Sequence, residues 1–325
     1  MSDKAETILT KAQRELWHGR PYYSLDAYCK NTVGRKLFKT AINAGFTCPN
    51  RDGTLDTRGC IFCSAGGSGD FAFQMEEAHP LSDSGNRNSK PEIIAYFQAY
   101  TNTYAPVSRL ETLYRTALSN PDVAGISIAT RPDCLPPDVL QLLKKLKEEF
   151  CISHEGQEAK FIWVELGLQT IHEKTAAYIR RGYPLSVFEK AVTALTAIDI
   201  PVITHIIIGL PGETKKQCME TIQYLNSRKI WGIKLQLLHV LQNTDLYKDY
   251  KAGNFSVLTK EEYIDILIDC IGQLHKDIVI HRLTGDGPKE LLEAPLWSLN
   301  KKDVLNSIHH EMKIQNIYQG IYCRK

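Results

Sequence analysis

Short apolar runs alternate with amphipathic stretches along most of this chain, and that alternation limits the possible fold more than any other feature. Six runs have the character of buried strands: 37–42, 92–100, 124–130, 161–168, 202–209 and 233–240. Five stretches show the apolar spacing of helices: 110–118, 138–149, 185–198, 215–225 and 260–275. Strands that alternate with helices form parallel sheets joined by crossovers. The pattern therefore predicts an α/β fold built on a six-stranded, partial (β/α)6 barrel.

On this prediction the chain has three parts. Its 325 residues exceed an average domain, but they fit one barrel with extensions. We expect an N-terminal extension over 1–36, a barrel core over 37–280, and a C-terminal extension over 281–325 that closes the barrel. Residues 79–91 are polar and lack a helical apolar period, so we expect a loop where a covering helix would normally lie.

Composition and charge say more about where the protein is located than about whether it binds nucleic acid. Apolar residues make up 43% of the chain, while a net charge of +2 neither requires nor excludes nucleic acid. No apolar run approaches the roughly 18 residues of a membrane span, and the polar start of the chain does not resemble a secretory leader. The nine cysteines are therefore expected in a cytoplasmic protein, where thiols serve as ligands more often than as disulfides.

Three of the cysteines lie in one loop. Cys48, Cys60 and Cys63 form a C-x11-C-x2-C array that runs directly into the glycine-rich segment 64–70. Three thiolates can hold three irons of a four-iron cluster and leave the fourth iron open for a ligand. The neighbouring glycines would let a small ligand approach the main chain. The spacing thus favours an iron–sulfur cluster.

A structural zinc site is the alternative interpretation of the same cysteines. Such sites normally close with four protein ligands. The nearest further candidates in the sequence do not repeat a zinc-knuckle spacing; they are Cys29, His79 and Cys134. Zinc therefore remains open but is less favoured than a cluster.

Polar or glycine-rich signatures follow several of the predicted strands. In parallel barrels the active site lies at the C-terminal ends of the strands. The signatures are 130–133, 165–170, His205, 209–214, and Gln236 with His239. Each alone is compatible with an ordinary turn or helix start. Five of them on one rim predict a functional site there.

With these residues the chain resembles the radical S-adenosylmethionine (radical SAM) superfamily, and specifically its elongator-like branch of bacterial YtqA/YhcC-type proteins. The resemblance covers roughly residues 18–320, and its carriers are the segments 45–50, 59–71, 96–104, 130–134, 164–170 and 281–287. The long first arm of the cysteine array matches this branch, whereas most of the superfamily uses C-x3-C-x2-C. The helix usual before the second strand looks abbreviated at 79–91.

The resemblance implies a [4Fe-4S] cluster, held by Cys48, Cys60 and Cys63, that binds S-adenosylmethionine at its open iron. One electron would then cleave S-adenosylmethionine to methionine and a 5′-deoxyadenosyl radical, which takes a hydrogen atom from the substrate. Arg181 would pair with the methionyl carboxylate, or it would be a solvated arginine at a helix end. The residues implied to contact cofactor or substrate are Phe62, Gly66, Gly67, Thr130, Asp133, Glu165, Gln169, Arg181 and Gly209.

The resemblance also implies partners. YtqA/YhcC-type proteins look linked to the wobble-uridine pathway of transfer RNA (tRNA), in which a carboxymethylaminomethyl group on (2-thio)uridine is trimmed to aminomethyl, cmnm5(s2)U to nm5(s2)U. A flavodoxin- or ferredoxin-type protein would supply the electron. The residues alone support RNA contact only through a basic N-terminal region carrying Trp17, Tyr22 and Tyr23. These aromatic side chains would either stack on bases or cover one end of the barrel.

Two other classes of function stay open: an iron–sulfur redox sensor or regulator, and a zinc-bearing RNA-binding protein without catalysis. Catalytic residues beyond the cluster are not identified, but three candidates stand out. His281 and Asp286 follow a strand-like run at 278–280 and would act as acid, base or substrate ligand, or belong to a structural network. Cys134 would supply a thiyl or a hydrogen atom, or be a small buried side chain.

Overall fold

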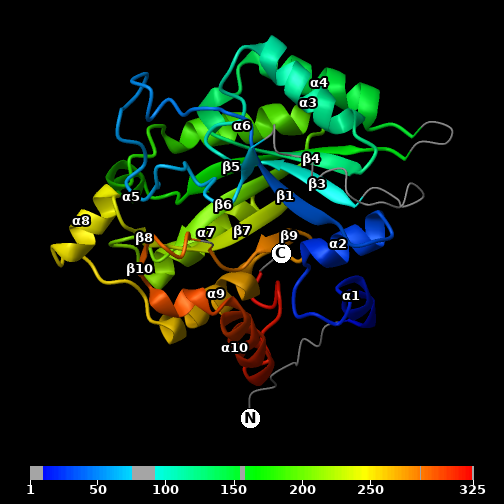
Figure 1. Cartoon of the computed structure of the whole chain (residues 1–325). Helices are drawn as coiled ribbons and strands as arrows, with labels where there is room; N and C mark the ends of the chain where they lie inside the picture. Colours follow the sequence, from blue (N-terminus) through cyan, green and yellow to red (C-terminus); the bar gives the residue numbers. More distant parts are fainter. Residues whose placement is uncertain (1–9, 75–91, 154–157, 286, 324–325) are drawn as a thin grey trace.

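The centre of the molecule is a sheet of eight strands in which every neighbouring pair is parallel. The computed structural model describes residues 10–74, 92–153, 158–285 and 287–323. The order across the sheet is β2-β1-β3-β4-β5-β6-β7-β9 (Figure 1). The strands are β1 (Phe38–Asn43), β2 (Phe73–Gln74), β3 (Ile93–Phe97), β4 (Val123–Thr130), β5 (Phe161–Gln169), β6 (Val202–Ile208), β7 (Gly232–Leu237) and β9 (Val279–Arg282).

Helices connect most of these strands and cover the outer face of the sheet, as Figure 1 shows. They are α3 (Val107–Ser119), α4 (Pro137–Phe150), α6 (Leu185–Ala197), α7 (Lys215–Asn226) and α9 (Lys260–Gln273). The local sequence favours the start of some of these helices through capping residues. For example, Thr259 and Glu262 form a capping box at the start of α9, which satisfies main-chain N–H groups that the helix itself cannot.

The six predicted strands and five predicted helices are confirmed, each with ends within three residues of expectation. The partial barrel is also confirmed. Among the described residues the sheet does not close into a ring, because β2 and β9 lie at opposite ends of the strand order. The division of the chain into an extension, a barrel core and a second extension, with boundaries after residues 36 and 280, stays a prediction. The strand β9 runs across the second of these boundaries. The loop expected at 79–91 lies outside the described residues.

Several elements were not anticipated from apolar spacing, mainly because they are short. A small antiparallel sheet pairs β8 (Val240–Leu241) with β10 (Leu292–Ala294). The other helices are α1 (Lys11–Leu16), α2 (Leu25–Thr32), α5 (Glu173–Tyr178), α8 (Asp245–Lys251), α10 (Lys301–Ile314) and the 3-10 turns Pro132–Cys134 and Leu296–Leu299. Of the described helices, none is long and apolar enough to cross a membrane.

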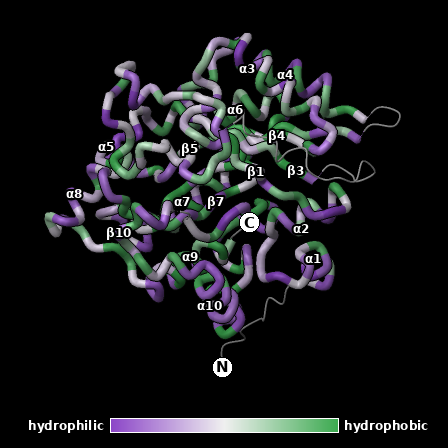
Figure 2. The backbone as a smooth tube through the Cα atoms, in the orientation of Figure 1, coloured by the Kyte–Doolittle hydropathy of each residue, from purple (hydrophilic) through white to green (hydrophobic). Residues whose placement is uncertain are grey.

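The central strands β3 to β7 are largely buried on both faces, whereas β2 at the edge is exposed. All eight residues of β4 are buried, as expected for a parallel strand between a helical layer and a filled barrel. Figure 2 shows hydrophobic residues concentrated along the central strands, whereas the outer helices α1, α3 and α10 alternate between hydrophilic and hydrophobic positions. The main core therefore lies between the sheet and its covering helices.

The inside of the barrel is plugged at the N-terminal ends of the strands. Ile94, Trp163 and Ile203 lie near the starts of β3, β5 and β6 and form one buried cluster with Cys29 of α2. Tyr28 of α2 packs edge-on against Trp231, with ring centroids 4.8 Å apart. Because α2 and these rings fill this end, the accessible part of the interior lies toward the C-terminal ends of the strands.

The two ends of the described chain pack together beside β9. Gln319 donates from its side-chain nitrogen to the carbonyls of His275 and Ile278, at 2.8 Å each. Its side-chain oxygen accepts from the Tyr23 N–H at 2.9 Å. Ile280 in turn donates its N–H to the Tyr23 carbonyl. These contacts fasten the N-terminal segment and the C-terminal segment to the same edge strand.

Candidate active site

The cysteine loop follows β1 and is held by two side chains of the arm between Cys48 and Cys60. The Arg51 guanidinium donates to the carbonyls of Cys63, at 3.1 Å, and Ser64, at 2.5 Å. The Asn50 side chain donates to the Arg180 carbonyl at 2.8 Å, and its nitrogen lies 3.5 Å from the Cys60 sulfur. The long arm between Cys48 and Cys60 is thereby folded back onto the C-x2-C turn.

Glycines let the end of this loop pack closely against the segment after β3. Gly67 has a φ of +57°, and a Cβ there would lie 2.3 Å from the Tyr100 ring. The Tyr100 hydroxyl donates to the Ala65 carbonyl at 2.5 Å. Gly66 is needed for a different reason, since its Cβ would lie 2.5 Å from the Asp70 carboxylate. Both glycines are thus required for the close packing of the loop, independently of any contact with a ligand.

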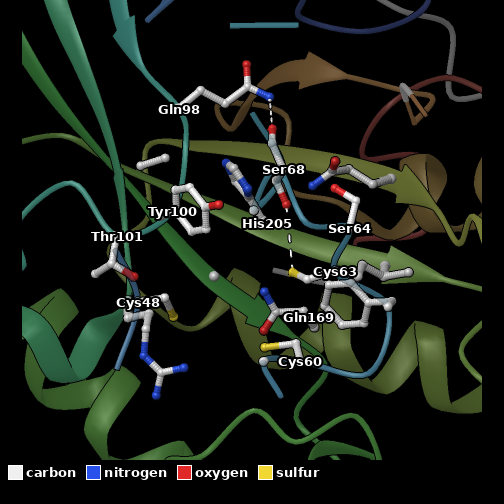
Figure 3. A pocket seen from close by; sticks show the side chains of 18 of the residues that line it. Cys48, Cys60, Cys63, Ser64, Ser68, Gln98, Tyr100, Thr101, Gln169 and His205 are labelled. Carbon is white, nitrogen blue, oxygen red and sulfur yellow. Dashed lines mark hydrogen bonds between the residues drawn. The ribbon is translucent and has the colours of Figure 1, made fainter. Parts of the chain in front are cut away.

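All three cysteines of the array line one cavity of about 240 Å³ at the C-terminal ends of the strands. Figure 3 shows Cys48, Cys60 and Cys63 around this space together with Gln169 and His205. Ser68 lies on the same wall, with its carbonyl accepting from Gln98 at 2.5 Å and its hydroxyl 4.0 Å from the Cys63 sulfur (Figure 3). The other six cysteines do not line the cavity.

The two thiols of the C-x2-C turn have pKa values shifted in opposite directions. A hydrogen bond from Cys63, followed by the positive charge of Arg131 and a hydrogen bond from Asn50, lowers the pKa of Cys60 to about 6. The same hydrogen bond, together with burial, raises the pKa of Cys63. Cys60 is therefore the thiol that ionises first, and a thiolate is the form that binds iron.

Three sulfur donors facing one space fit an iron–sulfur cluster better than a single ion. Among the described residues, no three His, Cys, Asp or Glu side chains are grouped so that they could hold one metal ion. Two of the residues considered as a fourth ligand lie elsewhere: Cys29 is in the aromatic plug, and Cys134 lines a separate hollow. His79 lies outside the described residues.

Most of the residues expected to contact cofactor or substrate line this cavity. They are Phe62, Gly67, Thr130, Glu165, Gln169 and Arg181, joined by His205, Gln236 and His239 from the predicted rim. Three others do not line it. Gly66 is turned toward Asp70, Asp133 pairs with Arg131 at 2.7 Å, and Gly209 occupies a turn with a φ of +90°. Arg131 itself reaches the cavity, so the Arg131–Asp133 pair borders it through the arginine.

Gln169 stands out at the end of β5. Its φ of +62° lies in the left-handed region, which non-glycine residues rarely adopt. A Cβ on Gly167 would lie 2.6 Å from the Gln169 amide nitrogen, so glycine there makes room for this side chain. The strand end thus turns sharply and directs Gln169 into the space that the cysteines surround (Figure 3).

Arg181 lines the cavity but its guanidinium is already bound by the protein. It donates to the carbonyls of Tyr183, Leu168 and Thr170 and forms an ion pair with Glu173 at 3.2 Å. The side chain is buried and is not a solvated arginine at a helix end. To bind a methionyl carboxylate it would have to exchange one of these partners, so that role stays a prediction.

A charged network in the middle of the barrel was only partly anticipated, through Glu165 and His205. Both Glu165 oxygens are saturated: one accepts from Lys39 and Ser127, at 2.5 Å each, and the other from Lys234 at 2.5 Å and His205 at 2.6 Å. The Lys234 ammonium also donates to the Tyr96 hydroxyl at 2.9 Å. The residues that sequence reasoning missed are Lys39, Tyr96, Ser127 and Lys234.

Electrostatics in this network follow from its burial. Burial alone would raise the pKa of Glu165, but Lys234, Lys39 and His205 hold it well below its usual range. Burial, with the nearby Lys39 and Arg282, lowers the pKa of Lys234 to about 7 against the opposing effect of Glu165. Burial, aided by Lys234, lowers the pKa of His205 to about 4, so this imidazole is neutral at physiological pH.

The three candidates for catalysis have different outcomes. His281 is packed edge-on against Trp231 and Trp163, at 5.0 and 5.8 Å, and neither ring nitrogen has a partner among the described residues. It belongs to the plug and does not line the cavity. Cys134 is buried beside Asp133 in the separate hollow, and burial raises its pKa to about 12. Asp286 lies outside the described residues.

The aromatic residues of the N-terminal region favour the structural alternative. Trp17 and Tyr22 are buried, and Tyr22 stacks on His309 of α10 with ring centroids 5.8 Å apart. Both rings are therefore packed inside the protein and are not exposed to stack on bases. Tyr23 is half-buried and packs near Tyr28.

Comparisons with known proteins agree with this geometry. Residues 48–225 match the family described as the radical SAM superfamily, and residues 230–314 match the radical SAM C-terminal domain. YtqA of Bacillus subtilis (strain 168) is 41% identical over 310 residues, which cover 94% of this chain and 93% of that protein.

More distant similarities extend to larger proteins. A tRNA uridine(34) acetyltransferase of Methanocaldococcus jannaschii is 26% identical over 172 residues, or 52% of this chain and 29% of that protein. The solved structure of Elp3 from the archaeon Methanocaldococcus infernus covers 87% of this chain and 65% of its own, with a TM-score of 0.63 and 18% identity. At that identity the likeness shows the fold alone.

Proposed function

The chain belongs to the radical SAM superfamily, in the elongator-like family that includes the YtqA and YhcC proteins, and from this membership we propose that it modifies the wobble uridine of tRNA. The proposed step trims the carboxymethylaminomethyl group of cmnm5(s2)U to the aminomethyl group of nm5(s2)U. The observation that carries the proposal is the cavity at the open end of the barrel, which Cys48, Cys60 and Cys63 line together.

Cys48, Cys60 and Cys63 would hold the [4Fe-4S] cluster of this family, and S-adenosylmethionine would lie beside it. When bound, these groups supply the reductive cleavage of S-adenosylmethionine that yields a 5′-deoxyadenosyl radical. The protein's part is positioning and exclusion. Arg51 and Asn50 fix the loop, Tyr100 fixes its glycine-rich end, and the plug behind the cavity keeps water from the N-terminal side of the barrel.

Two lines of support favour tRNA as the substrate. A partial relative is named for action on uridine 34 of tRNA, the wobble position, and its similarity covers half of this chain. The chemistry is also suitable. Removal of a hydrogen atom from the methylene between the nitrogen and the carboxylate, followed by loss of one electron, would give an imine, and water would hydrolyse this imine to the aminomethyl group and glyoxylate. The released electron equals the one consumed in the cleavage, so S-adenosylmethionine, split to methionine and 5′-deoxyadenosine, is the oxidant of the step. We further propose a flavodoxin- or ferredoxin-type protein as the electron donor, since the cleavage consumes one electron.

The first experiment is anaerobic reconstitution with iron and sulfide, followed by an assay for 5′-deoxyadenosine after chemical reduction. We expect a brown protein that forms this nucleoside, and a Cys48→Ala variant that does neither. Cys151→Ala is the matched control, because Cys151 is a partly buried cysteine at the end of α4 that does not line the cavity. A brown protein without 5′-deoxyadenosine would indicate a redox sensor, and a colourless protein with stoichiometric zinc would indicate an RNA-binding protein.

The second experiment tests the substrate. tRNA from cells that lack the protein should accumulate cmnm5(s2)U at position 34, as measured by mass spectrometry of its nucleosides. Adding the reconstituted protein, S-adenosylmethionine and a reductant to that tRNA should produce nm5(s2)U. Unchanged wobble nucleosides in both measurements would contradict the tRNA assignment and leave the radical SAM chemistry standing.

A further inference from the structure

The charged network in the barrel lies below the rim that the cysteines occupy. Lys234 precedes the last residue of β7, Leu237, by three positions, which places it about 10 Å down the strand. The β7 pattern explains its direction: Ile233 and Leu235 pack in the outer core, whereas Lys234 and Gln236 line the cavity. His205 of β6 is the direct pairing partner of Lys234, and it also faces the cavity.

The network carries more positive than negative charge. Lys39 and Lys234 share one carboxylate, that of Glu165, and His205 is neutral. Because both Glu165 oxygens already accept two hydrogen bonds each, this carboxylate has no capacity left for a ligand. A buried ammonium that is not fully matched by an anion is unfavourable, and an incoming anion would relieve that cost.

Lys234 is the group through which such an anion would be bound. Its ammonium has three N–H donors, and its partners among the described residues are the Glu165 carboxylate and the Tyr96 hydroxyl. Lys234 lines the cavity, whereas Lys39, on the opposite oxygen of Glu165, does not. Glu165 and Tyr96 therefore hold the ammonium in place and leave one donor for the cavity.

We propose that Lys234 binds a carboxylate on the substrate and so selects wobble uridines whose side chain ends in an acid. This inference rests on the proposed function and adds a specificity determinant to it. The carboxymethylaminomethyl group carries a terminal carboxylate, and a side chain reaching down from a base at the cavity mouth approaches Lys234 with that end first. Glu165 and Tyr96 act as positioning residues for the ammonium.

The first test uses only the wild-type holoenzyme and two synthetic anticodon stem-loops. One carries the carboxymethylaminomethyl group on uridine 34, and the other carries the same group with its acid converted to a neutral carboxamide. We expect KM to be roughly ten- to hundredfold lower for the acid, the range expected for a hydrogen bond to a charged group. Equal KM values for the two stem-loops would overturn the proposal.

The second test compares two substitutions in the same network. Lys234→Gln and Lys39→Gln each remove one ammonium from Glu165, but only Lys234 faces the cavity. Binding of both stem-loops to the holoenzyme variants is measured together with iron content. We expect Lys234→Gln to lose the preference for the acid and Lys39→Gln to keep it. Loss of the preference in both variants, or in neither, would contradict the assignment.

Three further outcomes separate this inference from the function on which it rests. S-adenosylmethionine also carries a carboxylate. Weaker S-adenosylmethionine binding in Lys234→Gln, with the acid preference intact, would assign the lysine to the cosubstrate and overturn the proposal. If the wild type cleaves S-adenosylmethionine but converts neither the acid stem-loop nor full-length tRNA, the proposed function fails and the inference fails with it. Conversion of acid and carboxamide alike removes the inference alone.

Discussion

At the scale of single residues, the buried charges of Arg181 and Glu165 are stabilised by different kinds of partner. Arg181 is matched by main-chain carbonyls and one carboxylate, so its guanidinium supports the end of β5. Glu165 is matched by four donors from four different strands, so its carboxylate organises the interior. Both residues are buried and both line the cavity, yet only the second leaves a neighbouring cation facing it.

Arg181→Ala tests whether this arginine is a support or a cofactor ligand. Removing the guanidinium takes away the side-chain donor to the carbonyls of the buried residues Thr170 and Tyr183, so we expect unfolding free energy to fall by about 3 kcal/mol. Urea denaturation of the protein measures this change. Lys174→Ala, on the neighbouring helix α5 and exposed, is the control. A raised KM for S-adenosylmethionine with unchanged stability would instead support the carboxylate-binding role.

The second prediction at this scale concerns pH. The groups near Lys234 are Glu165, Lys39, Arg282, His205 and Tyr96. Burial, aided by Lys39 and Arg282 and opposed by Glu165, lowers the pKa of Lys234 to about 7. If the charged ammonium binds the substrate, kcat/KM for the acid stem-loop should be highest below pH 7 and fall as the pH rises through about 7, because the proton is then lost.

His205 does not account for such a fall, because burial lowers its pKa to about 4, below that window. The carboxamide stem-loop is the control, since a neutral amide depends less on the charge of Lys234. A profile that is flat between pH 6 and pH 8.5 for the acid, or identical for acid and amide, would disagree with this account.

At the scale of elements, the cysteine loop is shaped by its contacts with the segment after β3. The Tyr100 ring occupies the position that a side chain on Gly67 would need, and the Tyr100 N–H donates to the Gly67 carbonyl. A change at Gly67 would therefore displace the wall that carries Ser68, next to the Cys63 sulfur. The loop is a packed element with a fixed shape, which suits the positioning of a cluster.

Gly67→Ala should lower the amount of iron retained after reconstitution, because its Cβ would lie 2.3 Å from Tyr100 in addition to the strain of a positive φ. Gly53→Ala provides the matched control: it lies in the same loop at a φ of +92° with nothing within 4 Å. That variant carries only the backbone cost, roughly 1–2 kcal/mol. Iron per protein is the measurement, and equal iron in both variants would show that packing against Tyr100 does not hold the loop.

At the scale of the whole molecule, the N- and C-terminal segments support the open barrel at the β9 edge. Gln319 joins the carbonyls before β9 to the main chain of Tyr23, and Tyr22 stacks on His309 of α10. These contacts are remote in sequence, so they form only when both ends of the chain are in place.

Gln319→Ala should lower unfolding free energy by about 1–3 kcal/mol, since it removes the side-chain partner of the buried Ile278 carbonyl and of the Tyr23 N–H. Chemical denaturation followed by circular dichroism measures the loss. Gln315→Ala is the control, because Gln315 is exposed and its side chain contacts only Glu311, at 3.3 Å. If the two variants were equally stable, the terminal segments would not be fastened through Gln319.

The alternating elements of the barrel and the cysteine array could be predicted from the amino-acid sequence alone. Both are local signals: apolar periodicity marks each strand and helix, and a C-x2-C turn with a nearby third cysteine marks its loop. The sequence also placed Gln169, His205 and His239 on the functional rim, because a residue at the C-terminal end of a parallel strand has a predictable position.

The contacts among polar residues within the strands became visible only in the folded structure. Lys39 and Lys234 interrupt apolar strands, a signal of an inward-facing charge, but their common partner Glu165 lies on a third strand more than sixty residues from either. The same holds for His281, whose sequence position suggests the pocket while its packing against Trp163 and Trp231 puts it in the plug. Such contacts depend on the register and twist of the assembled strands, which local sequence patterns do not specify.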